Sequence, residues 1–234
     1  MLPILITSPY SGANHFGENL FNLLHQWYGC RGFLHSFLNF DKNSFSTYSN
    51  GTIYHTYNYI NKPSDPDHYK HYFKERIQLL LTSPNHLLTY RPTGKALINL
   101  ETFKLLLDDL GYYPVYIERR NKLHQLLMHS AIKTNSKCPN IKYNNFFGGA
   151  MLGDIDRYNI IKNELPGQVV YYEDFIELGH DENAVIKLLD LDIKPFIHKD
   201  IKFNYINLTE KDIEHNGQWL SNKNKIFEEL KKIG

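Results

Sequence analysis

Residues 3–24 read PILITSPYSGANHFGENLFNLL, and this stretch decides the fold. Its apolar run Ile4-Leu5-Ile6 is typical of a parallel strand that is covered on both faces. Residues 8–12 interrupt the run with turn-forming Ser, Pro and Gly, and helical spacing of apolar residues then predicts a helix over residues 12–27. A strand, a turn of small residues and a helix, in this order, aim backbone N–H groups and a helix N-terminus at an anion. The stretch is therefore the best candidate for a binding site in the chain.

The turn has part of the pattern of a Walker A loop, which binds nucleotide phosphates. Gly12 and Gly17 have the G-x-x-x-x-G spacing, but Glu18 and Asn19 follow where that loop carries Lys and Ser or Thr. Because that lysine binds the phosphates and that hydroxyl binds Mg²⁺, the sequence argues against an ordinary nucleoside triphosphatase and weakens a nucleotide or sugar kinase. A plain strand–helix connection, in which Ser and Gly only cap the helix, is the alternative.

Composition limits the class of protein. The 234 residues suffice for one domain with a sizeable core, so we expect a single domain over residues 1–234. The 26 Lys and Arg residues balance 25 Asp and Glu residues, which argues against a nucleic-acid partner bound through bulk charge. Cys30 and Cys138 form no metal or disulfide pattern, so we expect a reducing, cytoplasmic location. The sequence shows neither a signal-peptide pattern nor an apolar run long enough to span a membrane, so we expect no membrane partner. The oligomeric state stays open.

Strands and helices alternate along the rest of the chain. Residues 28–66 are rich in Asn, Ser, Tyr and Gly, and we interpret them as an irregular insertion on the substrate side. Further strands are predicted at residues 86–91, 114–118 and 168–172. Further helices are predicted at residues 67–81, 97–110, 123–131, 152–162, 182–189 and 210–232, with a polar loop at 137–149. The alternation predicts an α/β domain of three layers, α/β/α, with a mainly parallel central sheet that binds ligands at the carboxyl ends of its strands.

Separate predicted strands lead into three segments, residues 7–14, 115–121 and 169–175. Together these segments resemble the PAPS-dependent sulfotransferases (PAPS is 3′-phosphoadenosine 5′-phosphosulfate). Residues 7–14, TSPYSGAN, are similar to the family's first loop, Pro-Lys/Arg-Ser-Gly-Ser/Thr, which binds the 5′-phosphosulfate. Residues 115–121, VYIERRN, are similar to its strand that ends in Arg-Asn or Arg-Asp and opens the helix over the 3′-phosphate. Residues 169–175, VVYYEDF, are similar to its Tyr-Glu-Asp strand end. The resemblance spans residues 2–189 and implies a P-loop-like sulfotransferase fold.

The resemblance implies that the first loop holds the phosphosulfate end of PAPS. Ser11, Gly12, Ala13 and Asn14 would offer backbone N–H groups at a helix N-terminus, which suits a multiply charged anion. Tyr10 belongs to the same loop and is counted with the residues that bind PAPS.

The other two segments imply contacts to the rest of PAPS. Arg120 would offer a guanidinium fork to the 3′-phosphate, with Asn121 and Gln125 as weaker candidates on the following turn. Tyr172 corresponds to the family tyrosine that lies beside the adenine. A solvated surface pair is the alternative interpretation of Arg119 and Arg120.

The sequence departs from the family pattern at three places. Tyr10 stands where the family loop has Lys or Arg, and loss of a charge at a developing anion typically raises the barrier by a few kcal/mol. The family serine eight residues beyond the arginine falls on Met128. Ser130, two positions on, points to another side of a helix but is counted with the residues that bind PAPS. Arg91 lies near the place of a catalytic histidine; it stays protonated and is no general base, but it would replace the missing loop cation.

The general base stays open among three residues. The bacterial sugar-modifying kind of sulfotransferase places a carboxylate after the first helix, which indicates His35 or Asp41, and His15 at the helix start is the third candidate. Glu173 and Asp174 are interpreted as anions at a helix N-terminus rather than as catalytic groups. No histidine pair has the spacing of a zinc site, and no metal is predicted.

These observations favour an enzyme that transfers a sulfuryl group from PAPS, its co-substrate, to a hydroxyl. The acceptor is expected to be a small molecule or a carbohydrate that lies against residues 28–66. The alternative is a sulfotransferase-like module that binds a nucleotide or a protein partner without chemistry, which the residues at positions 10, 91 and 128 favour.

Overall fold

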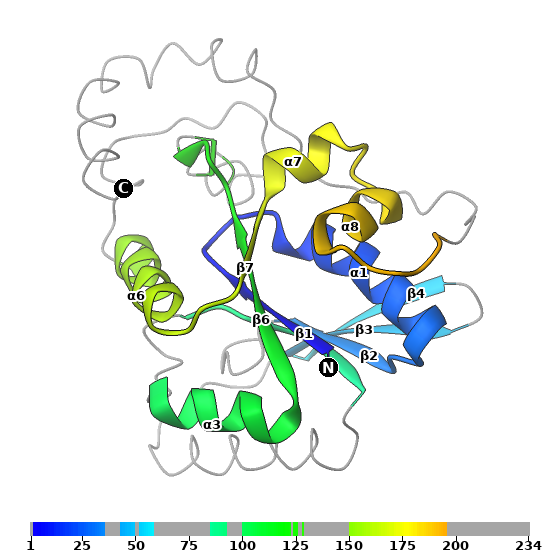
Figure 1. Ribbon diagram of the computed structural model, residues 1–234, viewed down its shortest axis with the longest axis horizontal. Helices are drawn as coiled ribbons and strands as arrows, with labels where there is room; N and C mark the ends of the chain where they lie inside the picture. Colours follow the sequence, from blue (N-terminus) through cyan, green and yellow to red (C-terminus); the bar gives the residue numbers. More distant parts are fainter. Residues whose placement is uncertain are drawn as a thin grey trace.

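The structure is a computed structural model that describes residues 2–35, 43–49, 52–58, 85–92, 100–122, 124–125, 128 and 150–195. Within these segments the backbone forms a seven-stranded sheet with the strand order β4-β3-β2-β5-β1-β6-β7 (Figure 1). Its strands are β1 (Leu2–Thr7), β2 (Gly32–His35), β3 (Asn43–Ser49), β4 (Thr52–Asn58), β5 (His86–Tyr90), β6 (Tyr112–Glu118) and β7 (Gln168–Tyr171).

Five neighbouring strands of the sheet are parallel: β2, β5, β1, β6 and β7. β3 runs antiparallel to β2, and β4 runs antiparallel to β3. The prediction of an α/β protein with a mainly parallel sheet is therefore confirmed.

The central strand, β1, is buried on both faces. Ile6 aligns with Tyr90 of β5 on one side and with Tyr116 of β6 on the other. Ile4, Leu5 and Ile6 are fully buried, and successive side chains belong to different clusters of the core. A continuous apolar run is what such a strand requires, because neither face meets water.

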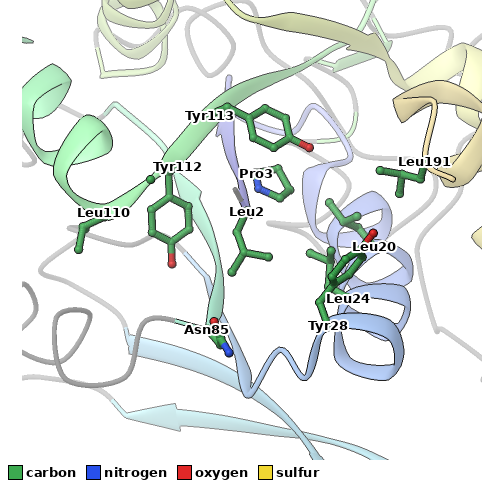
Figure 2. A pocket seen from close by; sticks show the side chains of 11 residues that line it. Leu2, Pro3, Leu20, Leu24, Tyr28, Asn85, Leu110, Tyr112, Tyr113 and Leu191 are labelled. Carbon is green, nitrogen blue, oxygen red and sulfur yellow. The ribbon is translucent and has the colours of Figure 1, made fainter. Parts of the chain in front are cut away.

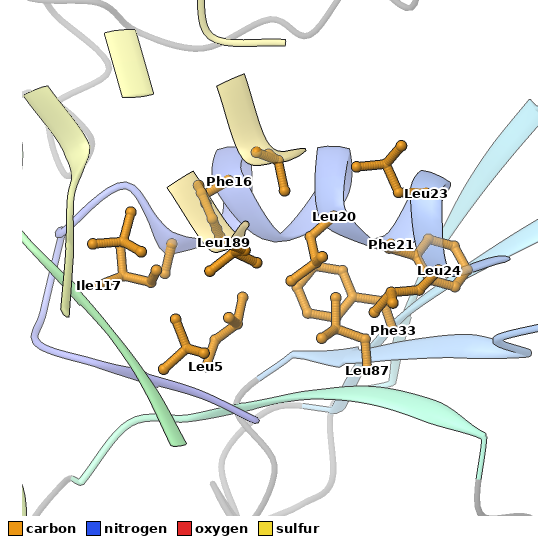
Figure 3. Close-up of a cluster of buried hydrophobic side chains, with 14 of the residues drawn as sticks. Leu5, Phe16, Leu20, Phe21, Leu23, Leu24, Phe33, Leu87, Ile117 and Leu189 are labelled. Atoms are coloured by element: carbon orange, nitrogen blue, oxygen red, sulfur yellow. The ribbon is translucent and has the colours of Figure 1, made fainter. Parts of the chain in front are cut away.

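Helices cover the two faces of the sheet. α1 (Ala13–Tyr28), α7 (Tyr172–Glu177) and α8 (Glu182–Leu189) share one core cluster with alternate residues of the strands. α3 (Leu100–Leu110) and α6 (Ala150–Glu164) contribute to a second cluster on the opposite face (Figure 1). Figure 3 shows the apolar side of α1, with Phe16, Leu20 and Leu24, facing the strand residues.

Gly17 allows α1 to lie close to the sheet. A Cβ atom at this position would lie less than 3.0 Å from two ring carbons of Phe33 on β2, and 3.1 Å from Leu5. The glycine is therefore required by helix–sheet packing, and its spacing from Gly12 needs no phosphate-binding explanation.

The expectation that residues 28–66 are irregular is wrong. Their described parts contain the end of α1 and the strands β2, β3 and β4, which extend the main sheet. These strands were not predicted because their composition is polar, although their Thr, Tyr and Ile residues favour extended structure. The sequence Asn50-Gly51 between β3 and β4 is the dipeptide typical of a two-residue hairpin and was the overlooked signal.

Most of the other predicted elements within the described segments are confirmed. The strands at 86–91, 114–118 and 168–172 correspond to β5, β6 and β7, except that Tyr172 begins α7. The helices at 12–27, 97–110, 152–162 and 182–189 correspond to α1, α3, α6 and α8. Of the helix predicted at 123–131, residues 124, 125 and 128 are described and are helical. The elements predicted at 67–81, 137–149 and 210–232 lie outside the described residues. Among the helices that the structure describes, none combines the length and the apolar character needed to cross a membrane.

Candidate anion-binding site

The turn between β1 and α1 lies at the point where the strand order changes direction. The chain leaves β1 through α1 toward β2 on one side, and later passes from β5 across β1 to β6. α1 packs on one face of the sheet, whereas α3, which lies between β5 and β6 in the chain, packs on the other. Open α/β sheets bind ligands outside the carboxyl ends of their strands at such a switch point. The turn is therefore where the topology favours a ligand.

Two residues of the turn have left-handed backbone conformation. The φ angle is 57° at Tyr10 and 90° at Gly12, which is the N-cap residue of α1. Gly12 provides no side-chain cap, and the first turn of α1 contains no acidic residue. An uncapped helix N-terminus with no carboxylate in its first turn favours an external anion.

Tyr172, the first residue of α7, packs directly on Gly12. A Cβ atom on Gly12 would lie less than 3.0 Å from three carbon atoms of the Tyr172 ring. The turn therefore needs glycine at this position for two reasons, its backbone conformation and the close approach of an aromatic ring.

Near the turn, buried polar atoms of two residues have no hydrogen-bond partner among the residues that the structure describes. Ser11 is 1% exposed, and its Oγ atom has no hydrogen-bond partner among the described residues. Gln125 donates from Nε2 to Ser8 Oγ at 2.9 Å and to the Pro9 carbonyl, while its own Oε1 atom has no such partner. Because buried polar groups are normally paired, these atoms make the turn a candidate for binding a polar ligand.

Arg119 is a buried cation that lies against the ring of Tyr172. Its side chain is 4% exposed, and its guanidinium carbon lies 4.3 Å from the ring centroid of Tyr172. Nη1 donates to Nδ1 of His124 at 3.3 Å, but Nε has no partner in the described segments. Burial lowers the pKa of Arg119, and the neighbouring Tyr172 and Glu173 raise it. A buried guanidinium with an unused donor is a strong attractor for an anion.

Arg120 points away from this cluster, to the surface. Its guanidinium forms a two-pronged hydrogen bond with Asp174, and its carbon lies 4.2 Å from the Tyr171 ring centroid. The backbone N–H groups of Arg120 and Asn121 donate to the Glu173 carboxylate at 3.1 and 3.2 Å. The carboxylates of Glu173 and Asp174 lie in the first turn of α7, as the sequence predicted.

Strand alternation explains why the two arginines differ. Val115 and Ile117 of β6 face the core on the side of α1, and Arg119 follows them at the same spacing. Glu118 faces α6 instead, where it accepts hydrogen bonds from Tyr158 at 2.9 Å and Lys162 at 2.6 Å. The resemblance implied Arg120 as the ligand-binding arginine, but the strand period of two indicates that Arg119 is the buried one.

His15 is buried against Tyr172. Its Nδ1 atom lies 2.9 Å from the Tyr172 hydroxyl, and its ring centroid lies 5.5 Å from that of His180. Burial, and to a lesser extent His180, lower the pKa of His15 to about 4. At neutral pH the imidazole is therefore uncharged and weakly basic, which suits a hydrogen-bond partner of Tyr172 better than a general base.

Stability is expected to depend on pH through His15. The pKa of His15 is lower in the folded protein, about 4, than the usual value of 6.5, so the unfolded chain binds more protons between these values. The contribution of His15 to the free energy of unfolding should therefore be complete above pH 6.5. It should be lost as the pH drops toward 4, which lowers the free energy of unfolding by at most about 3 kcal/mol. Urea unfolding at several pH values should show this loss in the wild type but not in His15→Gln. Equal pH profiles for the two proteins would contradict the assignment.

Arg91 approaches the turn from the other face of the sheet. It follows β5, and its guanidinium carbon lies 5.4 Å from the ring centroid of Tyr10. Nη2 of Arg91 lies 3.8 Å from Oδ2 of Asp154 on α6, and Asp154 also accepts from Nη1 of Arg157 at 3.3 Å. Nε of Arg91 has no hydrogen-bond partner within the described parts of the chain. Arg91 thus places a cation beside Tyr10, which stands where the family loop has Lys or Arg. Asp154 is a neighbour of Arg91 that the sequence did not indicate.

The remaining predicted residues are only partly described. Ala13 and Asn14 form the first turn of α1, where Ala13 is buried and Asn14 is exposed. His35 is the last residue of β2, at the same edge of the sheet as the turn, and its side chain is not among those described. Asp41 and Ser130 lie outside the described residues.

A cavity of about 460 Å³ lies at the opposite edge of the sheet (Figure 2). Leu2 and Pro3 line it at the start of β1, and Tyr112 and Tyr113 line it at the start of β6, next to the end of α1. Its lining combines leucine side chains with tyrosines and Asn85 and contains none of the predicted site residues, so the cavity is separate from the turn.

Fold and site together define an α/β protein with a candidate anion-binding site at its topological switch point. The chain matches no protein-family model, no curated protein and no solved structure. In the segments that the structure describes, no three His, Cys, Asp or Glu side chains form a group that would hold a metal ion.

Proposed function

We propose that this protein is a sulfotransferase that uses PAPS and modifies a hydroxyl group of a small-molecule or carbohydrate acceptor. The observation that carries the proposal is the turn between β1 and α1, where buried donor groups of Ser11 and Arg119 have no partner among the residues that the structure describes. The central position of β1 and the helices on both faces support a complete three-layer, P-loop-like sulfotransferase fold. Cysteine usage supports a reducing, cytoplasmic compartment.

The residues at the turn fit a nucleotide that carries several phosphate charges. Ser11, Gly12 and the first turn of α1 would hold the 5′-phosphosulfate through backbone N–H groups and the Ser11 hydroxyl. Arg119 would neutralise the same charge from its buried position behind Tyr172. Arg120 would bind the 3′-phosphate, as the resemblance implies, and the Tyr172 ring would contact the adenine.

When bound, PAPS supplies the sulfuryl group and the adenosine bisphosphate that leaves. Catalysis by this chain would then be mainly positioning and stabilisation of charge. Arg91 would place its charge beside Tyr10, where the related enzymes carry a loop cation. His15, uncharged, would hold the Tyr172 hydroxyl and keep the aromatic ring against Gly12. The proton of the acceptor hydroxyl would pass to His35 or Asp41, which we retain as the candidates for the general base.

The acceptor would lie on the side of β2, β3 and β4. His35 ends β2 beside β5, and Arg91 follows β5, so both lie toward this side of the turn. β3 and β4 carry Ser, Thr, Asn and Tyr, which suit a ligand rich in hydroxyl groups. A carbohydrate is the acceptor class that this composition favours.

Transfer of radiolabelled sulfate tests the proposal. The protein is incubated with labelled PAPS and separate pools of saccharide and phenol acceptors, and labelled product is expected only with the intact protein. Arg119→Met should abolish transfer, whereas Arg31→Met, at the other edge of the sheet, should leave it unchanged. No product with any pool, despite measured PAPS binding, would favour the second candidate below.

The second candidate is a nucleotide-binding module that has lost its chemistry. Tyr10 favours it, because this residue occupies the place of the loop cation and is held with a left-handed backbone, φ 57°. Tyr10→Lys separates the two candidates. We expect sulfuryl transfer by Tyr10→Lys to be slower than transfer by the wild type, since Arg91 already supplies the charge. If the wild type is inactive and Tyr10→Lys is active, the protein is a lapsed enzyme.

A further inference from the structure

At the end of β6, two carboxylates of α7 occupy a complete set of hydrogen-bond donors. Glu173 accepts from the consecutive backbone N–H groups of Arg120 and Asn121. Asp174 accepts two hydrogen bonds from the Arg120 guanidinium, one of them at 2.7 Å. This pairing is the main cause that raises the pKa of Arg120.

The same set of donors suits an external phosphate. A guanidinium fork next to consecutive backbone N–H groups is a common way of binding a phosphate monoester. In this structure the carboxylate oxygens of Glu173 and Asp174 stand where the oxygens of such an anion would stand. The chain thus fills its own anion site.

The two carboxylates differ in how readily they give up their partners. Glu173 bonds to the backbone, which is fixed by the end of β6. Asp174 pairs with a flexible side chain at the surface, where the Arg120 and Asp174 side chains are 51% and 30% exposed. Water and salt screen an exposed pair, so it is weak and exchanges readily. The contact of Arg120 with the Tyr171 ring, at 4.2 Å, would keep a released guanidinium near the strand end.

We propose that Asp174 is a specificity-determining residue that competes with the 3′-phosphate of the nucleotide for Arg120. The inference rests on the proposed function. A doubly charged phosphate displaces the Asp174 carboxylate, whereas a neutral 3′-hydroxyl does not. Affinity for a 3′-phosphorylated nucleotide is then reduced by the fraction of molecules in which Arg120 is already paired. Asp174 thereby prevents anions that bind more weakly than this phosphate from pairing with Arg120.

Calorimetric titration of matched variants tests the inference. The ligands are 3′-phosphoadenosine 5′-phosphate (PAP) and adenosine 5′-monophosphate, which lacks the 3′-phosphate. The proteins are the wild type, Asp174→Asn and Glu177→Gln, together with Arg120→Ala and the double variant of Arg120→Ala with Asp174→Asn. Glu177 is an exposed acid on the same helix, so its substitution removes an equal charge. Circular dichroism verifies that each variant is folded.

We expect Asp174→Asn to tighten PAP binding about two- to fivefold more than Glu177→Gln does, as an exposed pair would allow. This excess should be absent with adenosine 5′-monophosphate and absent in the Arg120→Ala background. Equal effects of Asp174→Asn and Glu177→Gln, or weaker PAP binding by Asp174→Asn, would overturn the inference and leave the proposed function standing. No binding of either nucleotide to any of the proteins would overturn both.

Discussion

Gly12→Ala is expected to destabilise the protein and to abolish PAP binding. Alanine at a φ of 90° has a strained backbone, and its Cβ atom would lie less than 3.0 Å from three ring carbons of Tyr172. Tyr172 would have to move, which would remove its contact with the Arg119 guanidinium and its hydrogen bond to His15. Strain and the lost contacts together should lower the free energy of unfolding by about 3 kcal/mol. Urea unfolding and titration with PAP measure the two effects.

Gly29→Ala is the matched control for this substitution. Gly29 also has a left-handed backbone, with a φ of 64°, but no atom would lie within 4 Å of an added Cβ. Its substitution should therefore lower the free energy of unfolding by only about 1 kcal/mol and leave PAP binding unchanged. Equal losses of stability at the two glycines, with PAP binding intact in both, would show that the contact between Gly12 and Tyr172 does not shape the site.

Arg119→Met is expected to weaken PAP binding about 30- to 100-fold without lowering stability. The affinity falls because a charge-assisted hydrogen bond to an anion is worth about 2–3 kcal/mol. Stability should be unchanged or higher, because methionine fills a similar space and removes a buried guanidinium whose Nε atom has no partner in the described part of the chain. Calorimetric titration and thermal unfolding measure the two quantities. Loss of function with retained stability is the mark of a residue that serves a ligand rather than the core.

Two further variants control for charge and for shape. Arg31→Met removes the same charge from an exposed position, where the backbone of Arg31 bonds to that of Asn85 at the opposite edge of the sheet. It should alter PAP affinity by less than about twofold at moderate salt. Arg119→Lys keeps the charge but loses the planar fork, and we expect an intermediate affinity. If Arg119→Met and Arg31→Met weaken binding equally, Arg119 has no specific role.

The sequence predicts the centre of the fold well, because local patterns there agree with the tertiary structure. The apolar run of β1, the helical spacing of α1 and the apolar strand before Arg119 each have a single consistent interpretation. The hairpin of β3 and β4 was missed because its residues are mainly polar, although its two strands are neighbours in the chain. The dipeptide Asn50-Gly51 carried that information in a form that composition alone conceals.

The sequence indicated which strand ends carry the candidate residues, but not how their side chains contact one another. Sequence spacing placed Tyr10, Gly12 and Tyr172 at strand ends, and the strand order brings these ends together. The packing of Tyr172 on Gly12 and the pairing of Arg120 with Asp174 depend on elements more than 50 residues apart in the chain. Local propensity contains no information about such contacts. Burial of Arg119 follows from strand alternation, but only once the covered face of β6 is known.

The most direct test of the proposed nucleotide site is calorimetric titration of PAP into the wild-type protein, with adenosine 5′-monophosphate as the comparison. We expect one site with a dissociation constant of about 10 μM or lower for PAP. We also expect at least tenfold weaker binding of the nucleotide that lacks the 3′-phosphate, because Arg120 then has no phosphate to bind. No measurable binding of PAP at millimolar concentration, or equal affinity for the two nucleotides, would contradict the claim that the turn between β1 and α1 and the arginines at the end of β6 form a site for a 3′-phosphorylated nucleotide.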